Sequence, residues 1–257
     1  CRRMLQISDH RLPPPRLARA GLMYAWAGVA IMWVFWTTFV VFLAQPVHLL
    51  AVVPLPALDG AEGGPLPGAV LLDALLIGLF GLQHSVMARP SFKRLWADMP
   101  EAWQRVTYVH MANVALLALV FFWQPIPGLV WSIPEAGPAY SIAWGMFGLG
   151  WLILFAGAWS FGILELLGVR QMQAWAAGCA FRPVLKTSRL YRILPHPMYV
   201  GVLMGVWVTP RMTIGHLFLA AGMTLYVLIA LRYEERDLSQ RYGAAYRRWR
   251  HRDRLPA

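Results

Sequence analysis

The sequence predicts an all-α integral membrane protein: a bundle of five to six transmembrane helices with a C-terminal helical hairpin and a cytoplasmic amphipathic tail helix. Hydrophobic residues make up 58% of the 257 residues, and the mean hydropathy is +0.50. Only 14% of the residues are charged, whereas soluble domains carry about 25%. Several windows reach the roughly 20 apolar residues that cross a bilayer. These observations favour one membrane-embedded unit over soluble domains.

The net charge of +11 is distributed as in a multi-pass membrane protein. Apart from Arg211, the 23 Lys and Arg residues fall in four segments: 1–20, 89–105, 170–192 and 232–254. Positive charges gather on the cytoplasmic flanks of membrane helices, so this alternation predicts that both termini are cytoplasmic. Because the basic segments are juxtamembrane flanks, they indicate contact with membrane lipids and not with nucleic acid.

The first part of the chain is predicted to be a basic cytoplasmic tail, residues 1–20, followed by the N-terminal transmembrane helices, residues 21–168. The predicted spans are 21–44, 68–88, 106–124 and 139–168. A neutral outside loop rich in Pro and Gly separates the first two spans. A basic stretch with an amphipathic pattern, "SFKRLWADMPEAWQR", leads from the second span to the third. The chain is therefore expected to cross the membrane four times before its C-terminal region.

The C-terminal region, residues 169–257, contains an apolar stretch that is interrupted by "TPRMT". The part before the break, 193–208, is short, and the part after it, 213–231, is long enough to span a membrane. Because both flanks are basic, the two parts must form a hairpin that enters and leaves on the same side. The basic tail that follows is predicted to be a helix on the inner surface, with three aromatic residues at helical spacing: Tyr242, Tyr246 and Trp249.

Ionisable residues within apolar segments mark candidate functional sites, because such groups are costly to place in lipid. Four histidines fall in or at the ends of these segments: His84, His110, His196 and His216. The pair Glu234–Glu235 stands where the last span leaves the membrane. The hairpin begins beside His196 and ends beside this pair on the same side, so these residues are expected to form one pocket at the inner interface.

Two prolines, Pro195 and Pro197, flank His196 and remove two backbone donors. The backbone groups that they free could meet a polar ligand, and Gly201 permits close approach of a ligand or of a neighbouring helix. The alternative is a helix that starts with Pro in its first turn and has a small-residue packing face. Likewise, Glu234 and Glu235 could be a solvated helix face paired with neighbouring arginines.

The sequence offers little support for a haem, zinc, nucleotide or serine-nucleophile site. Paired membrane histidines can ligate haem, but His84 and His110 are not predicted to lie at the same depth in the membrane, as two axial ligands would. The sequence has no ligand cluster with zinc spacing, so no metal site is predicted. It also has no phosphate-binding loop, dinucleotide fingerprint or serine nucleophile elbow. A structural membrane protein without a ligand is the alternative from another class.

Two stretches, "YRILPHPMYVG" and "EERDLSQRYGAAYRRW", resemble the C-terminal signature of the isoprenylcysteine carboxyl methyltransferase-like membrane family. That signature is an Arg-His-Pro-x-Tyr-x-Gly run, a Glu-Glu pair and an aromatic-Gly-x-x-Tyr. The segments "GLQHSVMARPSFKR", "WQPIPGLVW" and "WVTPRMTIGHLF" are similar to bacterial members that methylate a small thiol. The resemblance covers most of residues 70–250 and implies a multi-pass protein of the bacterial inner membrane.

The resemblance also implies an activity and a set of binding residues. The implied activity is S-adenosyl-L-methionine-dependent methylation of a small thiol, methanethiol to dimethyl sulfide, at the cytoplasmic face; a prenylcysteine or a phospholipid is the alternative acceptor. The implied cofactor-binding residues are Arg192, His196, Pro197, Tyr199, Gly201, Glu234 and Glu235. The family usually has Arg directly before the His, where this chain has Pro195. Arg192 is therefore expected to hold the carboxylate of the cofactor instead.

A thiol acceptor also requires a base, because the thiolate is the nucleophile and His is the usual base near neutral pH. The candidates are His84 and His216, which both lie in the segments typical of the thiol enzymes. His84 is favoured because "QHS" lies at the predicted cytoplasmic end of its span.

Overall fold

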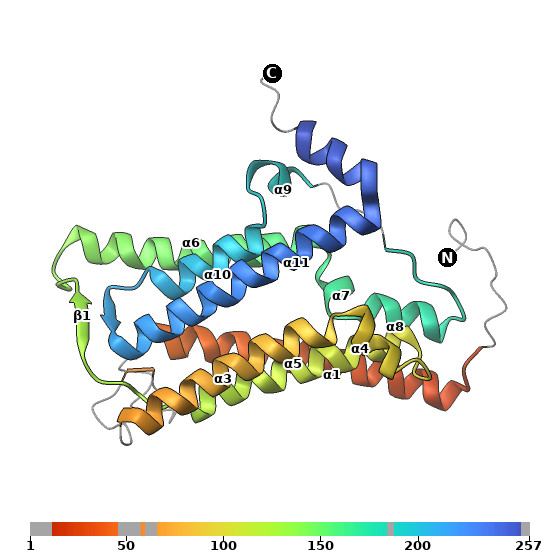
Figure 1. The fold of residues 1–257 in the computed structure, drawn as a ribbon, viewed down its shortest axis with the longest axis horizontal. Helices are drawn as coiled ribbons and strands as arrows, with labels where there is room; N and C mark the ends of the chain where they lie inside the picture. Colours follow the sequence, from red (N-terminus) through yellow and green to blue (C-terminus); the bar gives the residue numbers. More distant parts are fainter. Residues whose placement is uncertain (1–11, 46–57, 60–65, 184–187, 253–257) are drawn as a thin grey trace.

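The computed structural model describes residues 12–45, 58–59, 66–183 and 188–252, most of which are helical (Figure 1). The helices are α1 (Pro15–Ala44), α3 (Leu66–Met87), α4 (Pro90–Leu95), α5 (Glu101–Phe122), α6 (Pro138–Phe161), α7 (Ile163–Leu166), α8 (Val169–Ala176), α9 (Arg189–Ile193), α10 (Pro197–Trp207) and α11 (Ile214–Arg252). Two short strands are β1 (Leu129–Ser132) and β2 (Arg211–Thr213).

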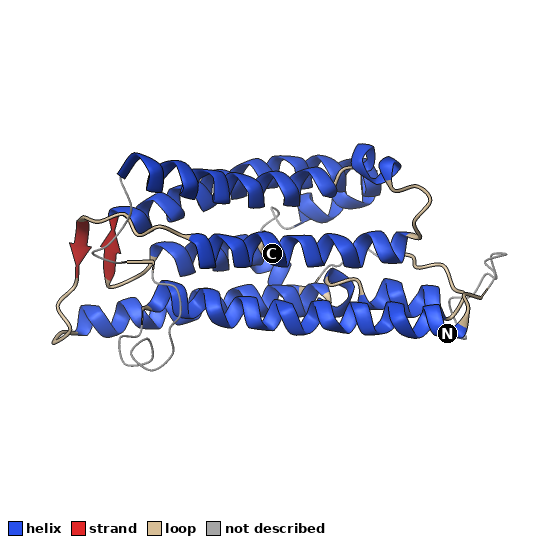
Figure 2. Ribbon diagram, turned by 90° about the horizontal axis from the view of Figure 1, so that it is seen from below, coloured by secondary structure: helices blue, strands red, loops and turns tan. Residues whose placement is uncertain are grey.

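The long helices lie side by side as an elongated bundle (Figures 1 and 2). Five are long and apolar enough to cross a membrane: α1, α3, α5, α6 and the part of α11 from Ile214 to Gln240. α10 is a shorter apolar helix, and it forms a hairpin with α11. The prediction of an all-α membrane protein with a C-terminal helical hairpin is confirmed.

The two ends of the bundle differ in charge. We call the end where α1 begins, α3 ends and α11 leaves the basic end, and the end that carries β1 and β2 the strand end (Figure 1). Of the Lys and Arg residues that the structure describes, Arg211 in β2 lies at the strand end. The other Lys and Arg residues belong to segments at the basic end. This is the separation of charge expected of a membrane protein.

An aromatic core joins the helices inside the bundle. α3 and α1 both pack on α5, α6 packs on α10, and α11 contacts both α10 and α3. Phe39 of α1 meets Trp151 of α6 edge to face, with ring centroids 6.1 Å apart. Val206 of α10 and Leu219 of α11 are fully buried in the same cluster. Such interlocked rings fix the helices relative to one another.

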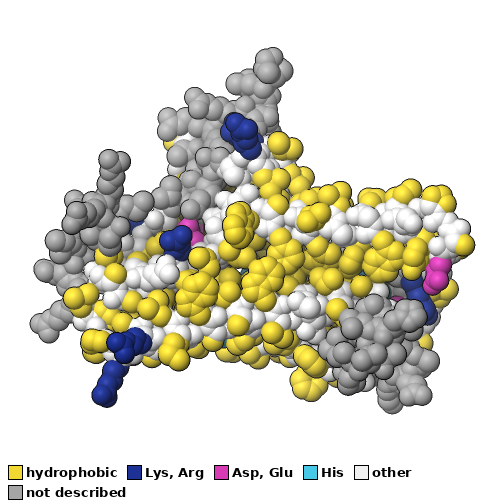
Figure 3. Space-filling view, turned by 180° about the vertical axis from the view of Figure 1, so that it is seen from behind, with side chains coloured by type: hydrophobic (Ala, Val, Ile, Leu, Met, Phe, Trp, Pro, Cys, Tyr) yellow, Lys and Arg dark blue, Asp and Glu magenta, His cyan; other side chains and the backbone are white. Residues whose placement is uncertain are grey.

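The outward faces of the helices are apolar (Figure 3). Exposed leucines follow α3 at Leu71, Leu75 and Leu82, and Leu149 and Leu152 are exposed on α6. A soluble monomer rarely exposes apolar surface of this extent. A bilayer would cover it, and the backbone groups of the helices are satisfied within each helix, as a lipid environment requires.

The fourth span is shorter than the predicted range 139–168. α6 ends at Phe161 because Gly162 adopts a φ of 103°, a left-handed conformation that suits glycine. Gly168, with a φ of 84°, redirects the chain again before α8. α8 then packs against α1 and α5 at the basic end. Two glycine turns thus convert the end of a predicted span into a folded cap.

A short antiparallel strand pair, which the sequence analysis did not predict, closes the strand end. Leu129 of β1 pairs with Thr213 of β2, and Ser132 pairs with Arg211. β2 lies within the "TPRMT" break of the hairpin. The pair therefore ties the connection before α6 to the turn between α10 and α11.

The tail remains helical beyond the membrane-spanning part of α11. The helix bends at Gly243, where φ is 48° and ψ is −120°, so its last turns run in a different direction from the rest of α11 (Figure 1). The placement of the tail on a membrane surface and the division at 1–20, 21–168 and 169–257 stay predictions. The start of the basic tail and most of the neutral outside loop lie outside the described residues.

Candidate active site

The site begins at the residue that precedes the short helix of the hairpin, α10. His196 is the N-cap of α10, with φ 53° and ψ 55°, values that are uncommon for a residue other than glycine and that recur at functional sites. Pro197 occupies the first helical position and is buried, a position where its missing N–H costs no helical hydrogen bond. The two prolines therefore hold the imidazole at a fixed corner where α10 starts.

The hairpin brings His196 against both carboxylates of α11, as expected from the sequence. Nε2 of His196 lies 2.9 Å from Oε1 of Glu235, and Nδ1 lies 3.8 Å from Oε2 of Glu234. The His196 and Glu235 side chains are about one-quarter exposed. Each ring nitrogen thus faces a different carboxylate in a partly desolvated setting, where such contacts are stronger than in water.

Two tyrosines complete the environment of this pair of carboxylates. The Tyr199 ring stacks on His196 with centroids 5.8 Å apart, and its hydroxyl lies near the Glu234 carboxylate. The Tyr246 hydroxyl donates to Oε1 of Glu235 over 2.8 Å. Tyr246 is buried because the bend at Gly243 turns the tail back toward the hairpin. We call these five residues, His196, Tyr199, Glu234, Glu235 and Tyr246, the carboxylate site.

Tyr191 is a further polar group beside this site. Its hydroxyl oxygen is buried and has no hydrogen-bond partner among the described residues. Burial, and then the nearby Glu234 carboxylate, raises the pKa of this phenol above its ordinary value. Tyr191 is therefore a neutral, unused donor. Its sequence position at the start of the "YRILPHPMYVG" stretch does not by itself predict this role.

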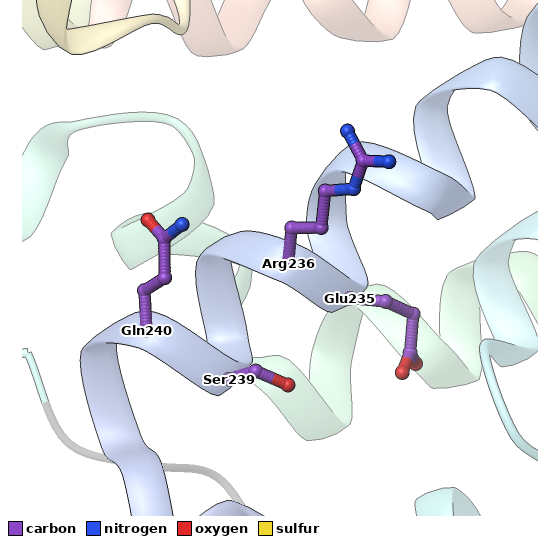
Figure 4. Close-up of a pocket in the computed structure, with 4 residues that line it drawn as sticks. All are labelled: Glu235, Arg236, Ser239 and Gln240. Carbon is purple, nitrogen blue, oxygen red and sulfur yellow. The ribbon is translucent and has the colours of Figure 1, made fainter.

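A surface hollow of about 320 Å³ adjoins the site on α11. The described residues that line it are Glu235, Arg236, Ser239 and Gln240. Figure 4 shows the Glu235 carboxylate projecting from one side of the helix and the Arg236 and Gln240 side chains from the other. Glu235 is thus shared between the carboxylate site and this hollow.

Two of the expected binding residues, Gly201 and Arg192, are not among the residues in contact at the carboxylate site. A Cβ atom on Gly201 would lie 2.5 Å from the Leu154 amide nitrogen and 2.6 Å from the Gly150 carbonyl oxygen. Gly201 therefore serves the close packing of α10 on α6, which was the alternative interpretation of this glycine. Arg192 lies on α9 with an exposed side chain and forms no ion pair with another described residue.

The two candidate bases are far apart in the fold. His216 is buried near the start of α11, eighteen residues before Glu234, which is roughly 27 Å along a helix. Its Nε2 atom lies 2.9 Å from the Val206 carbonyl oxygen, so it has a structural partner at the strand end. The structure does not bring His216 together with the carboxylate site.

His84 lies near the basic end among aromatic rings. Its ring centroid is 5.4 Å from that of Phe80, 5.0 Å from that of Tyr108 and 6.0 Å from that of Tyr226. Nδ1 of His84 is buried and has no hydrogen-bond partner among the described residues. The positions of Tyr108 and Tyr226 beside His84 could not be predicted from the sequence, because nothing in their local pattern separates them from ordinary core aromatics.

Arg89 fixes α3 to α11 beside these rings. Its Nη1 lies 3.3 Å from Oδ2 of Asp237, and its guanidinium carbon lies 4.4 Å from the centre of the Tyr233 ring. Nε of Arg89 also donates to the Ser85 carbonyl oxygen, one residue after His84. The end of α3 that carries His84 is therefore held against the helix that carries the glutamates.

The chain is similar in sequence to several bacterial enzymes. It is 43% identical over 208 residues to methanethiol S-methyltransferase 2 of Bradyrhizobium diazoefficiens, which covers 78% of this chain and 77% of the relative. It is 40% identical over 195 residues to methanethiol S-methyltransferase of Mycobacterium tuberculosis, 75% and 79% of the two chains. The enzyme of Pseudomonas deceptionensis is 41% identical over 196 residues, 75% and 74%.

No protein-family model matches the chain, and no solved structure does. The relatives nevertheless extend over three-quarters of this chain at 40% identity or more. The chain belongs to the methanethiol S-methyltransferase family.

Proposed function

We propose that this protein transfers a methyl group from S-adenosylmethionine to methanethiol at the cytoplasmic face of the bacterial inner membrane. The observation that supports this most strongly is the convergence of His196, Glu234 and Glu235, at 2.9 and 3.8 Å, where the two arms of the hairpin meet. The names of the relatives support the acceptor. The position of the site at the basic end supports access from the cytoplasm.

The residues of the carboxylate site fit S-adenosylmethionine chemically. Glu234 and Glu235 can accept hydrogen bonds from ribose hydroxyls or an amino group, and their charge favours a cation. Tyr191 offers a buried donor without a partner, which an acceptor atom of the cofactor would satisfy. Arg192 takes the part of the missing family Arg and holds the carboxylate of the cofactor. When bound, the cofactor supplies a methyl group on a positively charged sulfur.

His84 is the base in this proposal. An alkyl thiol such as free Cys ionises with a pKa of roughly 8.5, so a thiol in a dry site near neutral pH needs an acceptor for its proton. The unpartnered Nδ1 of His84 is available for that proton. His216 is not, because it lies at the strand end with its ring nitrogen bonded to Val206.

Glu235→Gln is expected to weaken binding of S-adenosylhomocysteine by about tenfold or more, because it removes the charge that strengthens these hydrogen bonds. Isothermal titration of the purified protein in detergent measures this. Tyr246→Phe serves as the matched variant: it removes one donor to the same oxygen but keeps the carboxylate, so a smaller loss is expected. Unchanged binding by Glu235→Gln would remove Glu235 from the cofactor site.

The proposed orientation places both ends of the described chain in the cytoplasm. We expect a green fluorescent protein fused after Ala257 to be fluorescent in bacteria and an alkaline phosphatase fused there to be inactive. The reverse pattern would place the basic end, and with it the carboxylate site, outside.

The activity itself is tested by headspace gas chromatography over membranes that contain the protein, methanethiol and S-adenosylmethionine. Dimethyl sulfide from the wild type and none from His196→Ala is the expected result. If folded wild-type protein forms no dimethyl sulfide, the thiol assignment fails, and a prenylcysteine or a phospholipid becomes the acceptor to assay. A Soret band in the purified protein would instead support the haem alternative.

A further inference from the structure

Four aromatic rings from three helices meet two helical turns deeper in the bundle than the carboxylate site. We call this set the aromatic cluster: Phe80 and His84 of α3, Tyr108 of α5 and Tyr226 of α11. Besides the three contacts of His84, the Phe80 and Tyr226 rings lie 5.0 Å apart. Phe80 is 5% exposed. The other three rings are half-buried, and the Arg105 guanidinium carbon lies 5.1 Å from the centre of the Tyr108 ring. The cluster thus surrounds one imidazole with aromatic rings and has one cation at its border.

The imidazole of His84 differs from the other two histidines inside the helices. Nε2 of His110 lies 2.9 Å from the Tyr24 carbonyl oxygen. Nε2 of His216 lies 2.9 Å from the Val206 carbonyl oxygen. Nδ1 of His84 is buried with no such partner among the described residues. A buried polar atom left without a partner costs free energy and points to a ligand or a catalytic role.

The aromatic cluster is continuous with the carboxylate site. Tyr226 and Tyr108 lie close enough to Tyr199 for their hydroxyls to interact electrostatically, and the Tyr199 hydroxyl lies near the Glu234 carboxylate. Along α11, Tyr226 precedes Glu234 by eight residues, about 12 Å of helix. A ligand held by the glutamates therefore has its deeper neighbours in the tyrosines and His84.

The packing of α3 on α11 makes this arrangement rigid. A Cβ atom on Gly81 would lie 3.3 Å from Cδ2 of Tyr226, so the two helices are close enough here that only a minimal side chain fits easily. Together with the Arg89–Asp237 pair, this contact holds the Phe80 and Tyr226 rings against each other and beside His84.

We propose that the aromatic cluster is the acceptor site, that it takes a small apolar thiol, and that Phe80 limits the size of that thiol; this inference rests on the proposed function. The thiol proton passes to Nδ1 of His84 as the thiol sulfur forms its new bond to the methyl carbon. The bond between that carbon and the sulfonium sulfur breaks, and its electron pair stays on the departing thioether. The aromatic rings exclude water, and an alkanethiol needs no specific hydrogen bonds from its binding site.

Phe80→Ala tests the size limit, because it removes the ring that closes the cluster. We expect the rate with 1-propanethiol, divided by the rate with methanethiol, to rise at least tenfold, since each methylene that fits an apolar pocket changes such a ratio by about 10–200-fold. Phe80→Leu, a milder truncation, is expected to raise the ratio less. Gas chromatography of the two thioether products gives the ratio directly.

Phe39→Ala is the matched control. Phe39 is equally buried, at 2% exposed, but it packs against Phe35, Phe42 and Trp151 away from the aromatic cluster. The Phe39→Ala variant loses a phenyl ring, as Phe80→Ala does, and leaves a similar cavity. It is therefore expected to be less stable than the wild type but to keep the wild-type ratio of the 1-propanethiol rate to the methanethiol rate. A ratio that rises equally in Phe39→Ala would show that loosened packing, and not the acceptor site, sets the size limit.

A second readout separates this inference from the proposed function. S-adenosylhomocysteine is expected to raise the melting temperature of wild type and of Phe80→Leu alike, because a ligand that binds the folded state stabilises it. A normal shift with an unchanged thiol ratio in both Phe80 variants overturns the acceptor site alone. No shift in wild type, together with no thioether product, overturns the proposed function itself.

Discussion

We expect His84→Gln to lower methyl transfer to methanethiol about a hundredfold at pH 7 and to change its dependence on pH. General-base catalysis contributes roughly 10²–10⁴-fold, and glutamine cannot accept the thiol proton at neutral pH. The variant must use thiolate that forms in solution. Its rate should therefore rise about tenfold for each pH unit until the thiol is ionised, whereas the wild-type rate should depend less on pH in that range. Initial rates of dimethyl sulfide formation between pH 6 and 10 measure both effects.

The matched variant for this experiment is His110→Gln. His110 is also an intramembrane histidine, but its ring nitrogen is bonded to the Tyr24 carbonyl oxygen, so its loss should leave the wild-type pH profile. A His84→Gln enzyme that keeps the wild-type profile would show that His84 is not the base. A melting-temperature shift with S-adenosylhomocysteine confirms that the variant still folds and binds.

The largest expected loss of stability is that of Gly201→Ala. The added Cβ would lie 2.5 Å from the Leu154 amide nitrogen and 2.6 Å from the Gly150 carbonyl oxygen, and both of these are backbone atoms that cannot rotate away. Overpacking of this kind costs about 1–3 kcal/mol or more. We expect the melting temperature of the protein in detergent to fall by on the order of 5 °C. The intrinsic fluorescence of its tryptophans, recorded during heating, measures this change.

Gly148→Ala on α6 provides the comparison for Gly201→Ala. A Cβ atom there would meet nothing within 4 Å, and alanine favours a helix over glycine by about 1 kcal/mol. The melting temperature should therefore stay unchanged or rise slightly. Equal destabilisation by the two substitutions would contradict the close packing of α10 on α6.

Much of the fold could be predicted from the sequence because hydropathy and charge are local properties. A run of about 20 apolar residues needs a membrane-spanning helix wherever it occurs, and the basic segments indicate which ends share a side. The same reasoning predicted that the hairpin would bring His196 to Glu234 and Glu235, because the two arms of a hairpin begin and end together. The shortened fourth span was missed, since hydropathy does not register the backbone turns at Gly162 and Gly168.

The rest of the candidate site was decided by how the helices pack. Hydropathy says that α3, α5 and α11 cross the membrane, but it does not say which faces meet. Rotation of one helix by a single residue, about 100°, would take Tyr226 away from His84. The sequence left His84 and His216 both as candidate bases, with His84 favoured by its place at the end of its span, and the fold then placed His216 at the strand end and His84 near the basic end.

The sequence by itself determined the membrane bundle, its charged end and the motif that forms the carboxylate site, because each depends on residues that are neighbours along the chain or are joined by one hairpin. Only the tertiary structure assigned Gly201 to helix packing, turned Tyr246 back onto Glu235 through the bend at Gly243, and gathered the aromatic cluster around His84. These features depend on distances between helices that are far apart in sequence, and those distances are set by the interlocking of side chains and not by the pattern along any one helix.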